Sequence, residues 1–381
     1  MKIFQLCKLI QHCYRHNYIT TIILLLTGPV LLDDLGITLT HEHLFSDFSN
    51  CFKRAPYSHE LSRDHTKITL KGSGYLNLYP YSNMNNLKFL DKGKIISQSE
   101  ILQFRQHDGK TIVENSNHGL RCFNMQDKYR NVSLKQNINI IIGTGYYVAQ
   151  TQVGSTLNMS KENMYNVMCT ELKKGIADRE HYKTSLIKAG FIGEVGSSWP
   201  IHAFEKRSIS TTGEVQEKLH CPVSFSPGSN ASGSKASAPM EIMRIYQEAG
   251  GNARKAIMCH VDRTLTNEEQ LMEFADDNKC YIQFSMFGTA CSFYQHDPTA
   301  VILSDAERVE FIAKFKKESK LDQVLMSHDI HTKNRLAKYG GHGFGHIGQC
   351  IIPYMRESGF ADEDITQLMV ENPKNWLSWG Q

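Results

Sequence analysis

GITLTHEHL, residues 36–44, places an apolar, β-branched run directly before two histidines that are separated by a single residue. Side chains two residues apart in a strand point to the same face, so His41 and His43 can present both imidazoles to one ion while Glu42 points away. Imidazole is a common ligand of divalent metals, although a histidine on the surface is commoner than a ligand. The stretch therefore predicts a strand that ends in a metal-binding pair.

Seven further apolar, β-branched runs follow, with helical stretches between them. Such alternation predicts parallel strands joined by crossover helices, which is the pattern of a (β/α)8 TIM barrel. The expected strands are residues 36–40, 111–114, 138–143, 190–195, 222–226, 256–260, 280–284 and 323–327. The fold class we expect is α/β, with one barrel domain over residues 28–381.

Two segments interrupt this alternation. Residues 50–105, approximately, exceed any normal connection between a strand and a helix, and we expect a loop insertion over the mouth of the barrel. The Gly- and Ser-rich residues 226–239 predict a second loop directly after the fifth strand. Residues 1–27 precede the barrel as an N-terminal extension whose order the sequence does not decide.

Two helix starts carry the S/T-x-x-E spacing of a capping box, in which each side chain bonds a free backbone N–H of the first turn. One pair is Ser304 with Glu307, and the other is Thr266 with Glu269. We expect a helix to begin at each pair.

The composition argues against several classes of partner. Forty-two Lys and Arg against 39 Asp and Glu give a formal net charge of +3, spread along the chain, so we expect no nucleic-acid partner. Ten cysteines without a Cys-x-x-Cys pair favour a reducing, cytoplasmic setting. The apolar run 22–26 is too short to span a bilayer, so no membrane partner is expected, although secretion through a signal peptide is the alternative. Association into a homodimer is left open.

Polar residues also close four other apolar runs: Glu194, Ser226, His260 and Asp329. Active sites of TIM barrels are assembled at the carboxyl ends of the strands, so these side chains should meet the His41 and His43 pair. Each residue alone has a structural explanation, such as a surface ion pair or a satisfied core position, but three imidazoles and two carboxylates together suit one or two divalent ions such as zinc. Glu194 could bridge two metals, and Asp329 could both ligate a metal and accept a proton from a metal-activated water.

Six motifs over nearly the whole chain resemble those of the phosphotriesterase family, within the amidohydrolase superfamily. They are GPVLLDDLGITLTHEHL (28–44), FIGEVGSSWP (191–200), MCHVDRT (258–264), MSHDIHTK (326–333), KYGGHGFGH (338–346) and ENPKNWL (371–377). The resemblance implies a (β/α)8 barrel with a binuclear centre, usually of zinc, and hydrolysis by a metal-activated hydroxide.

The resemblance also implies a role for each motif residue. His41, His43 and Asp329 would hold one metal, His260 would help to hold the second, and Glu194 would bridge them. Bacterial phosphotriesterases use a carbamylated lysine as the bridge, so a glutamate indicates the phosphotriesterase-related branch. Vertebrate members of that branch are associated with hydrolysis of N-acetyltaurine and similar N-acetyl amino acids, which implies a small amide, or an ester, as the substrate.

An anionic substrate would need a nearby cation, and three basic residues follow the strand ends: Arg263, Lys333 and Arg335. We expect them to be candidates for substrate binding, although each could equally be a solvated loop charge.

One departure from the family concerns the second metal. The family has a histidine in an HPG segment after the fifth strand, where this chain has Ser226-Pro227-Gly228. A neutral hydroxyl is a far poorer zinc ligand than imidazole. Three alternatives follow: a mononuclear enzyme, a two-metal enzyme in which water or another side chain fills the gap, and a catalytically weakened barrel with a binding or scaffolding role. His202 and His220 lie within plausible reach along the sequence, but neither is at the matching strand end.

Overall fold

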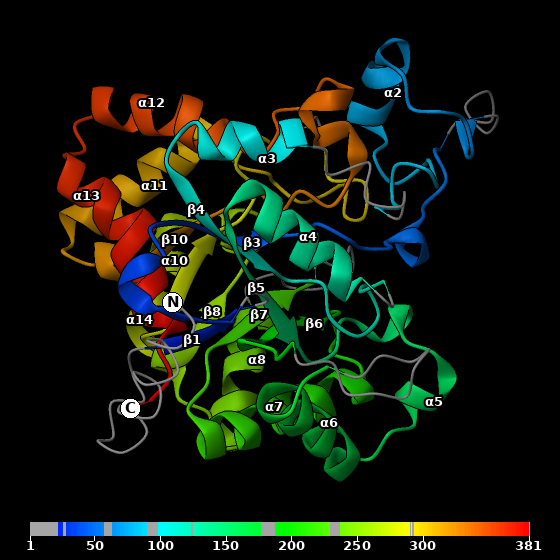
Figure 1. Cartoon of the computed structure of the whole chain (residues 1–381), viewed down its shortest axis with the longest axis vertical. Coiled ribbons are helices and arrows are strands. Elements are labelled where there is room, and N and C mark those ends of the chain that lie inside the picture. Colours follow the sequence, from blue (N-terminus) through cyan, green and yellow to red (C-terminus); the bar gives the residue numbers. More distant parts are fainter. Residues whose placement is uncertain are drawn as a thin grey trace.

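Figure 1 shows the computed structural model, which describes residues 22–25, 28–56, 63–89, 98–122, 125–176, 187–228, 237–289, 291 and 293–380. Within these residues, eight parallel strands pair in chain order from β3 to β10. They are β3 (Ile37–Glu42), β4 (Gly109–Glu114), β5 (Asn139–Thr144), β6 (Phe191–Ser197), β7 (Val223–Pro227), β8 (Ala256–Met258), β9 (Tyr281–Phe284) and β10 (Val324–Met326). Each overlaps one of the eight strands expected from the sequence.

The first and last strands meet and bring the barrel close to closure. The Asp329 backbone N–H donates to the His41 carbonyl at 3.1 Å. The Ser327 hydroxyl accepts from the His41 N–H and lies 2.9 Å from the His41 carbonyl oxygen. These bonds join the residues after β10 to the end of β3, which confirms the expected TIM-barrel fold.

Helices follow the strands and cover the outside of the barrel (Figure 1). The longer ones are α3 (Gln98–Arg105), α4 (Gln126–Gln136), α6 (Lys161–Lys173), α7 (Ala203–Leu219), α8 (Ser237–Glu248), α10 (Glu268–Asn278) and α11 (Asp305–Lys317). The short ones are α2 (Ser73–Leu78), α5 (Gly154–Leu157), α9 (Val261–Thr264), α12 (Ile352–Glu357), α13 (Asp362–Thr366) and α14 (Asn372–Leu377). In the described part of the chain, none is long and apolar enough to cross a membrane.

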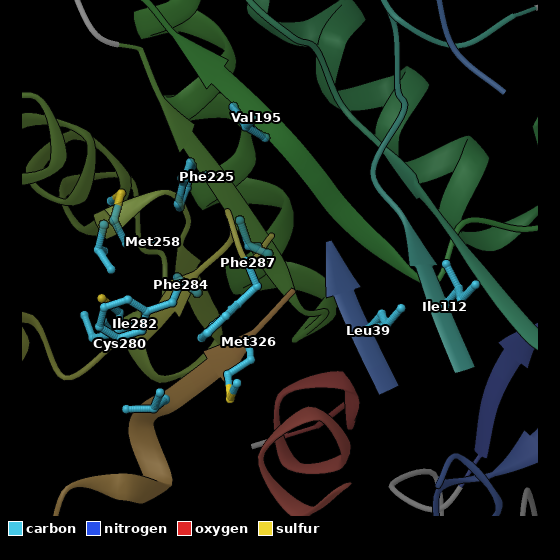
Figure 2. Close-up of a cluster of buried hydrophobic side chains, with 14 of the residues drawn as sticks. Leu39, Ile112, Val195, Phe225, Met258, Cys280, Ile282, Phe284, Phe287 and Met326 are labelled. Atoms are coloured by element: carbon cyan, nitrogen blue, oxygen red, sulfur yellow. The ribbon is translucent and has the colours of Figure 1, made fainter. Parts of the chain in front are cut away.

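Two separate apolar clusters follow from the alternation of side chains along the strands. Ile112 and Met258 belong to the large cluster that also contains the apolar faces of the helices, part of which is shown in Figure 2. Their neighbours Val113 and Ile257 belong to a smaller cluster inside the barrel. Trp376 of α14 is buried in this inner cluster, and its indole N–H donates to the Val223 carbonyl at 3.1 Å, so one end of the barrel is packed shut.

One of the two expected capping boxes is present. The Ser304 hydroxyl accepts from the Glu307 N–H at 3.3 Å, and the Glu307 carboxylate accepts from the Ser304 N–H at 2.6 Å. The prediction at Thr266 is wrong, because α10 begins one residue later. Asn267 caps this helix by accepting from the Gln270 N–H at 3.0 Å, and an asparagine is at least as good a cap as a threonine.

The insertion at about residues 50–105 contains regular structure in its described part. Helix α3 connects β3 with β4 in the manner of a crossover helix, and α2 lies earlier in the insertion. In the N-terminal extension, β1 (Ile22–Leu25) pairs antiparallel with β2 (Gly28–Leu31). Residues 22–25 of the apolar run behind the signal-peptide alternative thus form a strand, while residues 1–21, 26 and 27 lie outside the described residues.

Candidate metal centre

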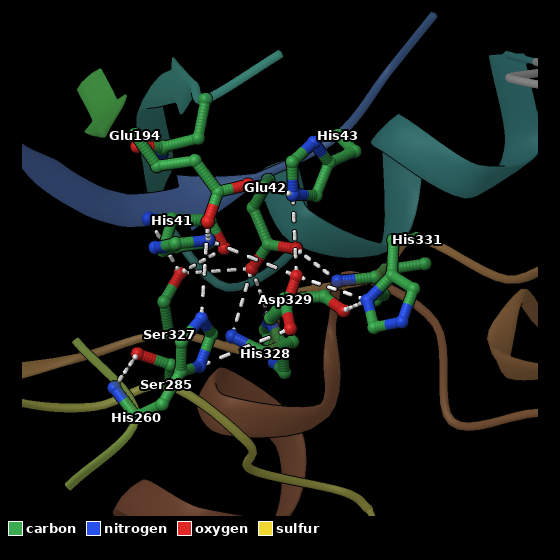
Figure 3. Close-up of polar contacts among 12 residues, drawn as sticks. His41, Glu42, His43, Glu194, His260, Ser285, Ser327, His328, Asp329 and His331 are labelled. Atoms are coloured by element: carbon green, nitrogen blue, oxygen red, sulfur yellow. Dashed lines mark hydrogen bonds and ion pairs between the residues drawn. The ribbon is translucent and has the colours of Figure 1, made fainter. Parts of the chain in front are cut away.

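Five buried side chains converge at the carboxyl ends of four strands (Figure 3). His41 lies in β3 and His43 follows it, Glu194 lies in β6, His260 follows β8, and Asp329 follows β10. The structure thus brings together all five residues that the sequence indicated as candidate metal ligands.

The spacing of their ligand atoms suits a small divalent ion. His41 Nε2 lies 3.4 Å from Glu194 Oε2 and 3.7 Å from Asp329 Oδ1. His43 Nε2 lies 3.3 Å from Glu194 Oε1 and 3.2 Å from Asp329 Oδ1. Ligand atoms around a tetrahedral zinc, with bonds of about 2.1 Å, stand about 3.4 Å apart. These nitrogen-to-oxygen separations are close to those that one such ion requires, and His41, His43 and Glu194 form a group whose ligand atoms all lie within 4.8 Å of one another.

The imidazoles carry buried nitrogens without hydrogen-bond partners. These atoms are His41 Nδ1 and Nε2, His43 Nε2 and His260 Nδ1. Buried polar atoms are nearly always hydrogen-bonded, so several exceptions in one place need an explanation. A metal ion would use such nitrogens as ligands, and the residues present fit it.

His260 stands further from the carboxylates than the other two imidazoles. Its Nε2 lies 3.9 Å from Glu194 Oε2, and its Nδ1 lies 4.0 Å from Asp329 Oδ2. His41, His260 and Asp329 nevertheless form a second group whose ligand atoms all lie within 4.8 Å of one another. A second metal position is therefore outlined, but more loosely than the first.

Electrostatics keeps both carboxylates ionised. Burial favours the neutral acid, but His41, together with the neighbouring His260 and His43, holds the pKa of Glu194 well below its ordinary value. Burial acts on Asp329 in the same way, and His331 more than offsets it, so the pKa of Asp329 is also well below its ordinary value. Two buried carboxylates in the charged form attract a cation.

The histidines differ from one another in protonation. Burial lowers the pKa of His43, but the adjacent carboxylates of Asp329 and Glu194 outweigh it and raise the value to about 9. Burial and the nearby Arg263 lower the pKa of His260 to about 4, so this imidazole is neutral at pH 7. Metal binding at His43 would displace a proton, whereas His260 is already in the form that ligates a metal.

Glu42 holds the chain on both sides of Asp329. Its buried carboxylate accepts from the Ser327 hydroxyl at 2.9 Å, from the His328 N–H at 2.9 Å and from the Ile330 N–H at 3.0 Å. Asp329 itself adopts a left-handed backbone conformation, with φ of 53°. A non-glycine residue pays a conformational penalty there, so these bonds are what keep its carboxylate aimed at the centre.

A hydrogen bond behind the ligands also orients one of the imidazoles. His43 Nδ1 lies 2.8 Å from the Ser116 hydroxyl, and the Ser116 N–H donates to Glu114 at 3.1 Å. Such a partner fixes the ring that faces a metal. At His260 the backbone N–H donates to the Ser285 hydroxyl at 3.1 Å, which holds the chain rather than the ring.

Ser226 is buried in β7 beside β6, but it is not among the residues that line the cavity above the ligands. His202 lines that cavity at its exposed side, where its Nδ1 caps α7 by accepting from the Phe204 N–H at 3.1 Å. His220 ends α7 at the opposite terminus. Within the described residues, neither histidine joins a metal-capable group, so neither replaces the missing imidazole.

A cavity of about 440 Å³ opens above the ligands and has an aromatic wall. Glu194, His260 and Asp329 lie among its lining residues, together with Arg263. The wall includes Phe48, Tyr81, Tyr147, Trp199, Tyr294, His296 and His331. Of the three basic residues expected near a substrate, only Arg263 lines this cavity, because the chain turns away after Asp329 into a short 3-10 helix, Lys333–Arg335.

Two residues of this wall were not found from the sequence. His331 Nδ1 lies 3.0 Å from Asp329 Oδ1, and His331 Nε2 lies 2.8 Å from the Tyr81 hydroxyl. The spacing of two residues between Asp329 and His331 could have indicated the first contact. Tyr81 belongs to the insertion, and no local pattern marks it.

Comparisons with known proteins agree with this geometry. The sequence profile of the phosphotriesterase family matches residues 24–377. Proteins named phosphotriesterase-related protein are 42% identical in Drosophila persimilis and 40% identical in Drosophila melanogaster, each over 353 residues, which is 92% of this chain and 97% of the relative.

Solved structures share the fold at lower identity. A resiniferatoxin-binding protein from Rhodobacter sphaeroides has a TM-score of 0.84 at 23% identity, covering 94% of this chain and 95% of its own. A lactonase from Listeria monocytogenes has a TM-score of 0.70 at 16% identity, covering 94% of this chain and 100% of its own.

Proposed function

Because the chain belongs to the phosphotriesterase family, we propose that it is a divalent-metal-dependent hydrolase of a small amide or ester, with zinc as the metal. The observation that carries the proposal is the position of the His41 and His43 Nε2 atoms, each of which lies 3.2–3.7 Å from carboxylate oxygens of Glu194 and Asp329. A lactonase among the proteins of similar fold supports ester-type hydrolysis as one form of this chemistry.

When bound, the metal would supply Lewis-acid polarisation of the scissile carbonyl and would lower the pKa of a water. His41, His43, Glu194 and Asp329 would hold it in the first position. His260 would contribute to a second position, which lacks an imidazole at Ser226. One tightly held metal per chain is therefore the stoichiometry we propose.

Asp329 is positioned to take a proton from the attacking water and return it to the leaving group. Its Oδ1 contacts His331 Nδ1, and the other imidazole nitrogen contacts the Tyr81 hydroxyl at the cavity wall. This chain of hydrogen bonds leads from the reacting region into the cavity. It would orient the Asp329 carboxylate and could carry the proton away from it.

Arg263 favours a substrate with an anionic group. It lies in the turn after His260, and its guanidinium donates to the Tyr294 hydroxyl at 2.6 Å and to the Pro227 carbonyl at 3.1 Å. Its Nε is buried without a hydrogen-bond partner, and no carboxylate of the described residues forms an ion pair with it. A carboxylate or sulfonate would neutralise this charge, so N-acetyl amino acids and N-acetyltaurine are the substrates we propose.

The second candidate function is a binding or scaffolding role without catalysis. The observation that favours it is Ser226, which removes one expected imidazole from the centre. In that case the cavity and Arg263 would bind a small anion without cleaving it.

The test measures hydrolysis by the purified chain loaded with zinc. N-acetyltaurine and N-acetyl amino acids are compared with a lactone and a phosphotriester, and released amine or acid is quantified. We expect turnover of the anionic amides and loss of this turnover in Asp329→Asn. The control is Asp322→Asn, which changes an exposed carboxylate just before the amino end of β10 and should leave turnover unchanged. Binding of these compounds without turnover of any substrate class would instead support the second candidate.

A further inference from the structure

A second cavity, of about 220 Å³, adjoins the one above the metal centre, and Tyr81 and Tyr294 line both. We refer to it as the Arg335 cavity. Its lining includes Arg335, Thr289 and His342, together with the aromatic side chain of Phe293. None of these four residues lines the first cavity.

Arg335 brings a buried positive charge to this cavity without a counterion. The residue is 8% exposed, and its guanidinium donates to the Asp329 carbonyl at 2.8 Å. Among the described residues, no carboxylate lies within ion-pair distance of it. Arg308 shows the usual solution, since its guanidinium contacts Asp262 at 2.8 Å and Asp305 at 2.7 Å. A buried cation without such a partner favours an anion from solution.

His342 contributes an unused acceptor. Its Nδ1 lies 3.1 Å from the Gly343 carbonyl, which can only accept, so Nδ1 carries the hydrogen. Burial, together with the nearby His328 and Arg335, holds the pKa of His342 well below its ordinary value, so the imidazole is neutral. Its Nε2 is then a bare acceptor that is buried without a partner.

Thr289 adds a third unsatisfied atom. Its hydroxyl is buried and has no hydrogen-bond partner, and a hydroxyl can donate as well as accept. The residues that line the cavity therefore carry a cationic donor at Arg335, a neutral acceptor at His342 and an adaptable hydroxyl at Thr289, next to aromatic surface. A plain anion would leave His342 Nε2 unpaired, whereas an anion that also carries an O–H or N–H would satisfy all three.

We propose that the Arg335 cavity binds a small hydroxy acid or amino acid through its anionic group. Its carboxylate or sulfonate accepts from Arg335 and Thr289, and its hydroxyl or amino group donates to His342 Nε2. Arg335 also donates to the backbone carbonyl of Asp329. A molecule bound to Arg335 would therefore be linked, through this hydrogen bond, to the backbone of the metal centre. The proposal does not rest on hydrolysis, since binding is measured directly.

The test is calorimetric titration of the purified full-length chain with four probes. Glycolate and taurine carry both an anion and a donor, acetate carries only the anion, and ethanolamine carries only the donor with a positive charge. We expect glycolate or taurine to bind, acetate to bind about tenfold more weakly, and ethanolamine not to bind.

Variants assign the binding to this cavity. His342→Phe and Thr289→Val should each weaken binding of the better probe by about fivefold to tenfold, and Arg335→Gln should abolish it. Arg263→Gln, which removes the cation of the first cavity, should leave it unchanged. Thermal unfolding of each variant checks that it is folded, and the two substitutions that leave Arg335 in place test the proposal even if Arg335→Gln is unstable.

Three results would overturn the proposal. The first is that neither glycolate nor taurine binds at millimolar concentration. The second is that binding is lost in Arg263→Gln and unchanged in His342→Phe, which would assign it to the cavity above the metal centre. The third is that acetate binds as well as glycolate and that His342→Phe has no effect, which would show that no donor is recognised.

Discussion

The two sides of the metal centre differ in how completely they are built. At β3 and β10, the imidazoles of His41 and His43 stand 3.2–3.7 Å from Asp329, and Glu42 holds the chain on both sides of Asp329. At β7 and β8, His260 stands 3.9–4.0 Å from the carboxylates, and Ser226 stands where the family resemblance implies an imidazole. One barrel thus places a tightly spaced candidate metal position beside a looser one.

The largest effect is expected at the complete side. Asp329→Asn removes a ligand charge and the proton acceptor together, so kcat/KM should fall by about 10³-fold or more. Bound zinc, measured by mass spectrometry, should fall with it. Activity within about tenfold of the native chain, with Asp322→Asn as the control, would show that Asp329 is dispensable and that the β3 and β10 side does not carry the chemistry.

Glu171 is a buried carboxylate outside the metal centre, and its replacement should change the stability of the fold without changing metal binding. Glu171 lies 3.0 Å from His118, and although burial raises its pKa, His118 and Arg121 lower the value to about 2. A depressed pKa in the folded protein gives stability that is present above the ordinary value of about 4.5 and is lost as the pH falls toward 2.

Urea unfolding of the native chain and of Glu171→Gln at several pH values measures this contribution. The native chain should be more stable by up to about 3 kcal/mol at pH 6, and the difference should shrink toward zero near pH 2. Zinc affinity at pH 7 should be equal in the two proteins. A stability difference that does not change with pH would contradict the assignment.

Replacing Glu42 tests whether its hydrogen bonds to the backbone around Asp329 are needed for metal binding. In Glu42→Gln the amide cannot accept on both sides, so one of the bonds from His328 or Ile330 is lost. Zinc affinity should fall by about 10–100-fold, as is typical for residues that orient ligands. Glu171→Gln is the matched control, because it removes a buried carboxylate away from the centre. Equal zinc affinity in Glu42→Gln and the native chain would mean that the left-handed Asp329 backbone needs no such support.

The smallest effect is expected at Arg263, on the incomplete side. Arg263→Lys keeps the charge but loses the fork that contacts Tyr294 and the Pro227 carbonyl. KM for an N-acetyl amino acid should rise by about tenfold, while kcat/KM for a neutral ester should stay within about twofold. An equal loss for both substrates would indicate that Arg263 shapes the cavity rather than recognising an anion.

The sequence predicts the barrel and the convergence of its candidate ligands well, because both follow local rules. Strand runs such as residues 138–143 are mostly apolar, and the candidate ligands lie at or near the ends of such runs. Asn267 shows the limit of local rules, since both it and the adjacent Thr266 are suitable N-cap residues and the sequence alone does not decide which one caps the helix. Tyr81 and the Arg335 cavity could not be predicted, because they depend on how the insertion packs against the loops after β9 and β10.

The most direct test is the number of zinc ions per chain in the native protein and in Ser226→His after exhaustive dialysis. An imidazole at position 226 would supply the ligand that the family resemblance implies on the β7 side. We expect one zinc in the native chain and two in Ser226→His, with no change in the affinity of the first. Two tightly held zinc ions in the native chain would contradict it, because the β7 side would then be complete without an imidazole.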